Sequence, residues 1–328
     1  MVKQILPLLM LLSVPALAAK PALTVYTYDS FSAEWGPGPA VKKAFEAQCG
    51  CELRYVALED GVSLLNRVRM EGKNSKADVV LGLDNNLLQA AQQTGLFAKS
   101  GVDLHNLTLP GGWQDQTFVP FDYGYFAFVY DKTRLKNPPT SLKELVESPQ
   151  KWRVIYEDPR TSTPGLGLLL WMQKVYGDKA PEAWQKLAQK TVTVTKGWSE
   201  AYGLFLKGEG DLVLSYTTSP AYHLIEEKKE NYAAAPFAEG HYLQVEVAAQ
   251  LASSKQPKLA QQFMQFMLTP AFQNAIPTGN WMYPVIKSDL PAGYQTLSVP
   301  QTALQFSPQE VAQQRADWIS AWQRAVSR

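Results

Sequence analysis

The chain has 328 residues, of which 46% are hydrophobic and 19% charged, and its formal net charge at pH 7 is +1. This balance is typical of a globular protein with a sizeable core, and the length is sufficient for two ordinary domains. A nearly neutral chain has no bulk field that attracts nucleic acid or an acidic membrane, so any binding specificity must come from a local site.

The first 18 residues have the features of a secretion signal. Lys3 gives a positive start, residues 5–14 are an apolar run, and Ala16-Leu17-Ala18 is a small-x-small cleavage motif. The run is too short to cross a hydrocarbon core of about 30 Å, which argues against a membrane anchor. We therefore predict export, a mature chain that begins at Ala19, and a mature net charge of zero, because Lys3 is the only charge removed from the +1 total.

Strands and helices alternate over the first part of the mature chain. The expected strands are rich in β-branched and aromatic residues and lie at 23–28, 52–57 and 77–82. Helical patterns lie between them, at 41–48, 62–72 and 87–94. This alternation predicts parallel βαβ units and therefore an α/β fold.

Cys49 and Cys51, between the first helix and the second strand, are the only cysteines. In an oxidising compartment they are able to pair, although a single intervening residue makes the loop strained. Two thiols without nearby histidines do not complete a structural zinc site. The spacing indicates a structural role and leaves the redox state open.

The alternation resumes in the second part of the chain. We expect strands at 126–130, 154–156, 192–195, 212–216 and 242–248, and helices at 141–147, 166–176, 180–189, 256–267 and 308–326. Ser141 and Glu144 form a capping box at the start of one helix. Because no linker separates the two parts, we predict two lobes joined by strands, with 121–130 and 242–248 as crossovers. Ligands of such folds bind beyond the carboxyl ends of strands and in interdomain clefts.

Motifs for catalysis or metal binding are weak. The three histidines, His105, His223 and His241, lack a metal-ligand spacing. Residues 197–201 lack the last glycine of a nucleophile elbow, and 165–167 lack the remainder of a dinucleotide-binding loop. Because catalytic groups assemble in space, these absences lower the probability of an enzyme without excluding one. We predict no catalytic residue, no metal and no cofactor.

A polar loop at 158–167 leads directly into a predicted helix. Thr161, Ser162 and Thr163 bring hydroxyl groups to the helix N-terminus, where free amide groups and the helix dipole favour an anion. The alternative is that Ser162 or Thr163 only caps the helix. The loop is therefore a candidate anion site.

Aromatic side chains are dense near three further segments. Trp198 and Tyr216 each follow a predicted strand, so we expect both in loops, with Tyr222 close behind and Trp281 in a third loop at 276–284. Rings at such places bind flat or cationic ligands through their faces. The alternative is that the rings cover the edges of the lobes.

These segments together carry a resemblance. Residues 24–31, 59–67, 76–84, 158–167 and 215–220 resemble the thiamine-binding members of the periplasmic solute-binding protein family, and the similarity extends over essentially the whole chain. The resemblance implies a type-II periplasmic-binding-protein fold with the ligand in the interlobe cleft. It also implies a monomeric receptor in the periplasm that delivers thiamine or its mono- or diphosphate to an inner-membrane ABC permease and its ATPase.

The resemblance further implies which residues bind. Thiamine contacts are expected at Asp60, Gly61, Ser162, Thr163, Trp198, Tyr216, Thr217, Thr218 and Ser219, with Tyr28, Tyr222 and Trp281 as further ring partners. Asp60 is equally suited to cap the helix that begins near residue 62. The expected lobe boundaries are 19–121 and 246–290 for one lobe, 122–245 for the other, and 291–328 for a segment that returns towards the second lobe.

Two other functions remain open. The same fold also suits ferric iron or an oxyanion, and iron receptors commonly use adjacent tyrosines, whereas Tyr216 and Tyr222 are separated by five residues. A secreted enzyme that modifies thiamine would need a nucleophile such as Cys49 or Cys51. The sequence does not rank thiamine against its phosphates.

Overall fold

The computed structural model describes residue 15 and residues 17–328. The predicted signal at 1–18 therefore lies almost entirely outside the described residues, and of its cleavage motif Ala16 does so too. Within the described part of the chain, no helix combines the length and the apolar character needed to cross a membrane. The predicted mature chain, which starts at Ala19, is described in full.

A mixed sheet runs through the whole molecule. Its strands are β1 (Ala22–Tyr28), β2 (Glu52–Leu58), β3 (Val79–Asp84), β4 (Phe97–Ala98), β5 (Val119–Asp131), β6 (Val154–Glu157), β7 (Thr191–Thr195), β8 (Leu212–Tyr216), β9 (Tyr232–Ala234), β10 (His241–Leu251), β11 (Tyr283–Pro284) and β12 (Ala303–Leu304). The strand order is β2-β1-β3-β10-β5-β8-β6-β7. β1 is parallel to β2 and β3, and β6 is parallel to β7 and β8, which confirms the predicted α/β class.

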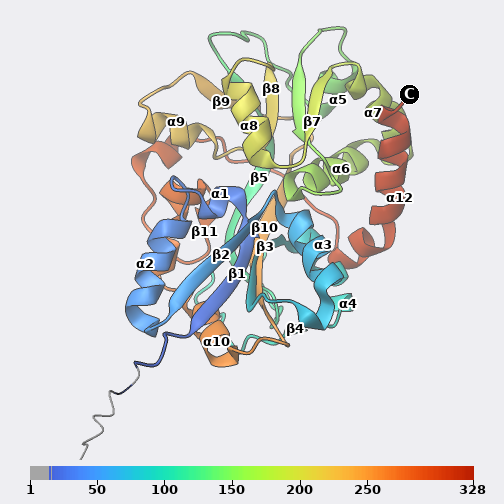
Figure 1. The fold of residues 1–328 in the computed structure, drawn as a ribbon. Helices are drawn as coiled ribbons and strands as arrows, with labels where there is room; N and C mark the ends of the chain where they lie inside the picture. Colours follow the sequence, from blue (N-terminus) through green and yellow to red (C-terminus); the bar gives the residue numbers. More distant parts are fainter. Residues whose placement is uncertain (1–14, 16) are drawn as a thin grey trace, which may run out of the picture.

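The sheet divides into two halves at β5 and β10, its two long strands. β5 pairs with β10 from Val119 to Tyr125 and then with β8 from Phe126 to Val129, so one strand belongs to both halves. We call the part around β1, β2 and β3 the first half and the part around β6, β7 and β8 the second half (Figure 1). The crossovers predicted at 121–130 and 242–248 lie in β5 and β10.

Helices cover both halves of the sheet (Figure 1). They are α1 (Asp29–Ser32), α2 (Gly38–Cys49), α3 (Gly61–Glu71), α4 (Leu88–Gln93), α5 (Leu142–Glu147), α6 (Thr163–Tyr176), α7 (Ala180–Ala188), α8 (Trp198–Leu206), α9 (Pro220–Glu226), α10 (Pro257–Phe266), α11 (Pro270–Gln273) and α12 (Pro308–Val326). Short turns of helix lie at η1 (Gly72–Asn74), η2 (Asn85–Leu87), η3 (Gly177–Lys179), η4 (Ile276–Asn280) and η5 (Ala292–Thr296). Every helix predicted from the sequence occurs, whereas α8, α9 and the short helices α1 and α11 were not predicted.

The last helix, α12, contacts elements of both halves. It packs against α7 and α6 on one side and against α4 and η2 on the other. Trp322 anchors it in the second half, because its indole Nε1 donates a hydrogen bond to Tyr156 Oη at 3.1 Å. The C-terminal segment therefore fastens one half of the molecule to the other along the side away from α9 (Figure 1).

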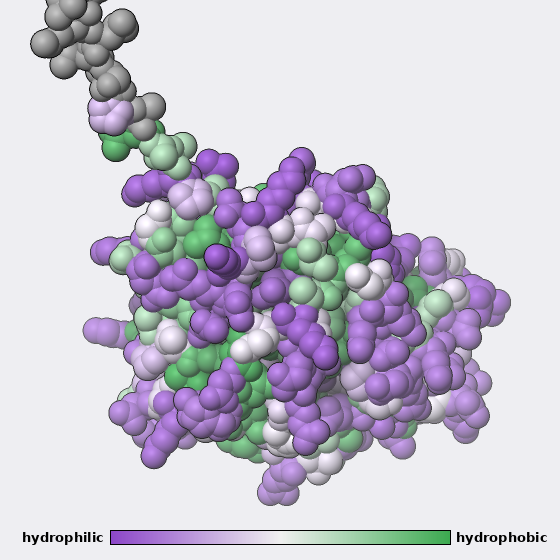
Figure 2. All heavy atoms as spheres, turned by 90° about the horizontal axis from the view of Figure 1, so that it is seen from below, coloured by the Kyte–Doolittle hydropathy of each residue, from purple (hydrophilic) through white to green (hydrophobic). Residues whose placement is uncertain are grey.

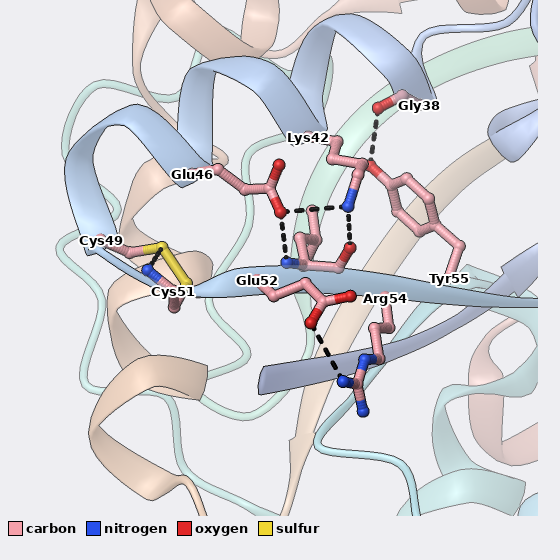
Figure 3. Close-up of polar contacts among 9 residues, drawn as sticks. Gly38, Lys42, Glu46, Cys49, Cys51, Glu52, Arg54 and Tyr55 are labelled. Carbon is pink, nitrogen blue, oxygen red and sulfur yellow. Dashed lines mark hydrogen bonds and ion pairs between the residues drawn. A yellow bond between two sulfur atoms is a disulfide. The ribbon is translucent and has the colours of Figure 1, made fainter. Parts of the chain in front are cut away.

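Cys49 and Cys51 form a disulfide at the end of α2, which resolves their redox state in this structure (Figure 3). The turn that they close leads straight into β2. Glu46 holds the same corner, because its Oε2 accepts hydrogen bonds from Lys42 Nζ at 3.0 Å and from the amide of Leu53 at 2.9 Å. The pair is thus part of a structural corner between α2 and β2.

The outer surface is largely polar. Seen from below, hydrophilic side chains cover most of the face, and hydrophobic side chains form smaller patches between them (Figure 2). The large hydrophobic side chains pack inside, as with Phe45, Phe121, Phe263 and Phe272 of the first half, which are fully buried. Burial of such rings is the main favourable contribution to folding.

Candidate functional site

A pocket of about 340 Å³ lies between the two halves of the molecule. Side chains of β1, α1, the β2–α3 junction, β10 and η4 line it from the first half, and side chains of α6, α8, β8 and α9 line it from the second. The lining residues are Tyr28, Ser30, Trp35, Glu59, Asp60, Thr163, Pro164, Trp198, Ser199, Tyr202, Gly203, Leu206, Tyr216, Ser219, Tyr222, Glu246, Gly279, Asn280, Trp281 and Met282. This position agrees with the interlobe cleft expected from the sequence.

Most of the predicted site residues contribute to this pocket. Those that line it are Tyr28, Asp60, Thr163, Trp198, Tyr216, Ser219, Tyr222 and Trp281. Those that do not are Gly61, Ser162, Thr217 and Thr218, all of which are buried beside it. The predicted residues are therefore brought together in space, although they come from segments far apart in the chain.

Asp60 lies where the N-termini of three helices converge. It is the N-cap of α3, and its Oδ1 accepts from the amide of Gly61 at 2.8 Å. Its Oδ2 accepts from Ser162 Oγ at 2.8 Å, at the start of α6, and from the amide of Trp198 at 3.1 Å, at the start of α8. Burial nevertheless raises the pKa of Asp60 to about 6, because desolvation outweighs these hydrogen bonds. The geometry is compatible with both roles predicted for Asp60, that of a helix cap and that of a ligand contact, since Asp60 caps α3 and borders the pocket.

The predicted anion site at the start of α6 already faces a carboxyl group. Ser162 Oγ donates to Asp60 Oδ2 and accepts from the amide of Gly165 at 3.1 Å, so it caps the helix. Thr163 Oγ1 donates to Asp60 Oδ1 at 3.2 Å. An arriving phosphate would have to share these hydroxyl groups with Asp60.

Two glycines allow the halves to approach closely at this place. A Cβ atom at Gly61 would collide with Thr163 Cγ2 and Gly82 O, and one at Gly197 would lie 2.5 Å from Glu59 O. Gly61 therefore has a packing role that no side chain is able to fill. The amide of Ser63 also donates across this contact to Thr161 O at 2.9 Å.

The prediction that Trp198 and Tyr216 lie in loops was wrong. Trp198 is the first residue of α8, and its ring stacks on Tyr202 one turn later, with centroids 5.0 Å apart. Tyr216 is the last residue of β8, and its hydroxyl donates to Gln244 Oε1 at 2.6 Å. Both rings are held rigidly, because a helix and a strand position them.

The turn after β8 joins the two sides of the pocket. Ser219 Oγ contacts Ser215 Oγ at 2.6 Å and accepts from the amide of Tyr216 at 3.2 Å, so it faces the pocket in a fixed orientation. Thr218 Oγ1 donates to the carbonyl oxygen of Trp281 at 2.5 Å. Thr217 is buried and has no hydrogen-bond partner for its hydroxyl among the described residues. Thr217 and Thr218 thus lie behind the lining.

Trp281 adopts an unusual backbone conformation. Its φ is 56°, one of the few positive values at a residue other than glycine, and it follows η4. Its ring packs edge-on against Tyr222, with centroids 5.4 Å apart. The left-handed conformation disfavours a bulky side chain, so its presence beside a pocket points to a functional constraint.

Several lining residues were missed from the sequence. Trp35 packs at a tilt against Trp198, with ring centroids 6.4 Å apart, and its signal in the sequence was an aromatic residue next to the turn at 36–39. Asn280 lay inside a segment already singled out for Trp281. Glu246 belonged to a predicted crossover strand, and nothing local distinguished it from a surface carboxylate.

The lining is acidic as well as aromatic. Its charged members are Glu59, Asp60 and Glu246, and none of the described residues that line it is Lys or Arg. Behind them lie three more buried carboxyl groups, those of Asp84, Asp122 and Glu157. Burial raises the pKa of Asp84 to about 6 and that of Asp122 to about 7. Because the described lining residues offer acceptors and no cationic side chain, the pocket suits a cationic or hydrogen-donating ligand better than a simple anion.

Asp122 and Glu246 form a carboxyl pair on the floor of the pocket. They are register partners on β5 and β10, and Asn280 Nδ2 donates to Asp122 Oδ2 at 2.6 Å and reaches Glu246 Oε1 at 3.4 Å. Burial and the neighbouring Asp122 raise the pKa of Glu246 well above its ordinary value. Two adjacent buried carboxyl groups do not both ionise readily, so the pair shares a proton.

No group of three or more His, Cys, Asp and Glu side chains is arranged to hold a metal ion in the part of the chain that the structure describes. Tyr216 and Tyr222 both line the pocket, but the hydroxyl of Tyr216 is engaged with Gln244. The geometry offers rings, hydroxyl groups and carboxyl groups to an organic ligand.

Comparison with known proteins gives consistent matches. The family model described as bacterial extracellular solute-binding protein matches residues 36–274. The chain is 78% identical over 328 residues to the thiamine-binding periplasmic protein of Escherichia coli (strain K12), with 100% of both chains covered. A solved periplasmic thiamin binding protein has a TM-score of 0.94 and 78% identity, over 95% of this chain and 98% of that chain. An iron-bound HitA from Pseudomonas aeruginosa shares the fold alone, with a TM-score of 0.75 and 22% identity over 93% of this chain and 99% of that chain.

Proposed function

This chain belongs to the bacterial extracellular solute-binding protein family, and from that premise we propose that it is the periplasmic receptor of an ABC importer for thiamine. It captures thiamine, or thiamine mono- or diphosphate, in the pocket between the two halves. It is a binding protein and not an enzyme, in agreement with the names of its relatives. The predicted secretion signal and the periplasmic relatives support the location.

One observation carries this proposal, namely the combination of rings and carboxyl groups in one pocket. The rings of Trp198 and Tyr202 stack on each other beside the pocket, and the ring of Trp35, from the segment after α1, packs at a tilt against Trp198. Thiamine has a flat aminopyrimidine and a cationic thiazolium, and aromatic faces bind both kinds of group. Acidic lining without Lys or Arg among the described lining residues favours a cation over an oxyanion.

Ligand capture requires the two lobes to close. We place their boundaries at 19–121 with 246–290, and at 122–245, with 291–328 as the segment that returns. The hydrogen bonds from the second half to Asp60 support this division, because they join two regions that β5 and β10 connect as strands. The closed receptor then presents both lobes to an inner-membrane permease and its ATPase, and we propose that it does so as a monomer.

A thiamine-modifying enzyme is less well supported. Its candidate nucleophiles, Cys49 and Cys51, are joined in a disulfide at the end of α2 and do not line the pocket. An iron receptor would need oxygen ligands that are free to bind, and the hydroxyl of Tyr216 donates to Gln244. A colourless purified protein and the absence of turnover with thiamine would separate the receptor from both alternatives.

Mass spectrometry of the released ligand tests the proposal most directly. Protein exported to the periplasm and purified without added vitamin is denatured, and the supernatant is examined for thiamine and its phosphates. We expect one of these compounds, and after its removal we expect tryptophan emission to change on titration with thiamine, because Trp35, Trp198 and Trp281 line the pocket. Absence of binding to thiamine and both phosphates would refute the proposal.

A further inference from the structure

The floor of the pocket has more hydrogen-bond acceptors than donors. The carboxyl pair, Asp122 and Glu246, contributes four oxygen atoms, and both side chains are at least nine-tenths buried. The donors around them are the amide nitrogen of Asn280, which also donates to Tyr28 Oη at 2.9 Å, the hydroxyl of Tyr28, and the shared proton. Asp122 Oδ1 receives no N–H or hydroxyl donor from the described residues, which leaves it available for the proton that it shares with Glu246.

Asp60 and Asp84, two other buried carboxyl groups near the pocket, are supplied with donors by the protein, whereas Glu157 has none among the described residues. Asp60 accepts from two backbone amides and two hydroxyl groups. Asp84 accepts from Gln244 Nε2 at 3.0 Å and from the amide of Asn86 at 2.9 Å. A buried acceptor that has no partner costs free energy, and a ligand is able to complete such a group only where the group faces a pocket. Glu246 is the member of the carboxyl pair that lines the pocket.

The position of the shared proton fixes what Glu246 is able to do. Burial, a side-chain hydrogen bond to Asp122 and the carboxyl groups of Asp122 and Asp60 raise the pKa of Glu246, although a hydrogen bond from Tyr28 acts in the opposite sense. A protonated Glu246 donates its proton to Asp122 and directs its other oxygen into the pocket as a neutral acceptor. The matching group on a ligand is an N–H donor without a requirement for charge.

We infer that Glu246, supported by Asp122, Asn280 and Tyr28, is the specificity-determining residue that accepts a hydrogen bond from an exocyclic amino group on a heteroaromatic ring of the ligand. The inference rests on the proposed function, because in thiamine the only amino group is that of the aminopyrimidine. The thiazolium has no N–H group to offer. The aminopyrimidine therefore lies at the floor, and the thiazolium lies nearer the rings of Trp35 and Trp198.

Substitutions at Glu246 distinguish this role from that of a counter-charge. Glu246→Gln keeps a neutral acceptor towards the pocket and an N–H donor towards Asp122, so thiamine affinity should stay within about threefold of the parent protein. Glu246→Leu removes the acceptor and should weaken binding at least tenfold, which is about 1.4 kcal/mol. Glu157→Gln is the matched control, because Glu157 is also a fully buried carboxyl group without a partner among the described residues but does not line the pocket.

Calorimetric titrations of these proteins with thiamine and with an analogue that carries hydrogen in place of the amino group test the inference. The parent, Glu246→Gln and Glu157→Gln proteins should each prefer thiamine at least tenfold, and Glu246→Leu should bind both compounds alike. Equal losses in Glu246→Gln and Glu246→Leu would show that the side chain acts as a charge and overturn the inference. Retained preference for thiamine in Glu246→Leu would also overturn it.

Thermal unfolding of each variant confirms that it is folded, and Glu246→Gln provides a functional control for the same position. A parent protein that binds neither thiamine nor its phosphates would refute the proposed function itself. That result differs from a parent protein that binds thiamine but does not distinguish it from the analogue, which would refute only the role of Glu246.

Discussion

Asp60 and the carboxyl pair both border the pocket, yet they differ in how their hydrogen bonds are completed. Asp60 has donors from three helix N-termini, and two of those helices belong to the other half of the molecule. The carboxyl pair lies in the strands and leaves Asp122 Oδ1 without a partner among the described residues. A buried carboxyl group whose donors come from both halves stabilises the contact between them, whereas a carboxyl group that lines the pocket and has few protein donors, as Glu246 does, is available to a ligand.

The largest effect should follow from loss of Asp60. Asp60→Ala removes the acceptor of two buried amides and two hydroxyl groups, and also the N-cap of α3. We expect the free energy of unfolding, measured with urea, to fall by about 2–4 kcal/mol. Glu246→Gln should change it by less than about 1 kcal/mol. Similar losses in the two variants would remove the distinction between a structural and a ligand-directed carboxyl group.

Trp281→Ala should weaken thiamine binding more than tenfold, as measured by fluorescence titration. A desolvated cation over an aromatic face is worth about 2 kcal/mol, and about 1.4 kcal/mol corresponds to tenfold. Comparison with Trp281→Gly separates the effect of the ring from that of backbone strain. Both variants remove the ring, but only glycine relieves the strain of the positive φ at this position. Normal affinity in both variants would show that this ring only covers Tyr222.

The pH dependence of stability should identify the carboxyl pair. The pKa of Asp122 is raised from 3.8 to about 7 by burial, so the folded protein holds this proton more tightly than the unfolded chain. The contribution of this group is therefore complete below pH 4 and is lost as the pH rises towards 7. Asp122→Asn does not ionise, so its stability relative to the parent protein should increase by about 2 kcal/mol between pH 5 and pH 8.

The parent protein and Asp122→Asn must be compared with each other, because the pKa values of the buried histidines are shifted in the opposite direction to that of Asp122. Burial lowers the pKa of His223 and His241, which reduces stability at low pH in parent and variant alike. Urea unfolding at several pH values measures the difference directly. A difference that stays constant with pH would contradict the shared proton of the carboxyl pair.

The smallest effect concerns the hydroxyl groups at the start of α6. If a phosphate reaches this place, Ser162 and Thr163 must turn from Asp60 towards it, so their net contribution is smaller than that of free hydroxyl groups. Replacement of both residues by Ala should weaken the mono- and diphosphate a few-fold more than thiamine. Equal losses for the three ligands in calorimetry would show that these hydroxyl groups serve only Asp60.

Local patterns were sufficient for most of the fold. The β-branched runs and the helical periods placed every long strand and eight helices, because these signals depend on a few consecutive residues. The helix α8 was missed although Trp198, Ala201, Tyr202 and Phe205 have helical spacing. Its aromatic residues were interpreted as part of a ligand-binding loop. The helix α9 was missed because residues 215–220 were interpreted as a binding segment, although Pro220 is a favourable first residue of a helix.

The site was only partly readable from the sequence. The rings and the 158–167 loop stood out by composition, but the carboxyl pair depends on the register between β5 and β10, which are far apart in the chain. The sequence around a single carboxylate in a predicted strand does not indicate whether its side chain is buried. Its role became visible only when Asp122, Asn280 and Glu246 were placed side by side.

The central position of β10 has a consequence for the order in which the protein folds. β10 lies between β3 and β5, so Val79 of β3 is unable to pair with Gln250 until the intervening chain, which includes strands β6 to β9 of the second half, has been synthesised. Such distant pairing makes loop closure slow, and the open edges of β3 and β5 stay exposed meanwhile. The second half is built around one continuous stretch and is therefore expected to form first. If the chain is exported from its N-terminus, its N-terminal part therefore stays unfolded for longest. An unfolded segment is able to cross a membrane, but it is also exposed to aggregation.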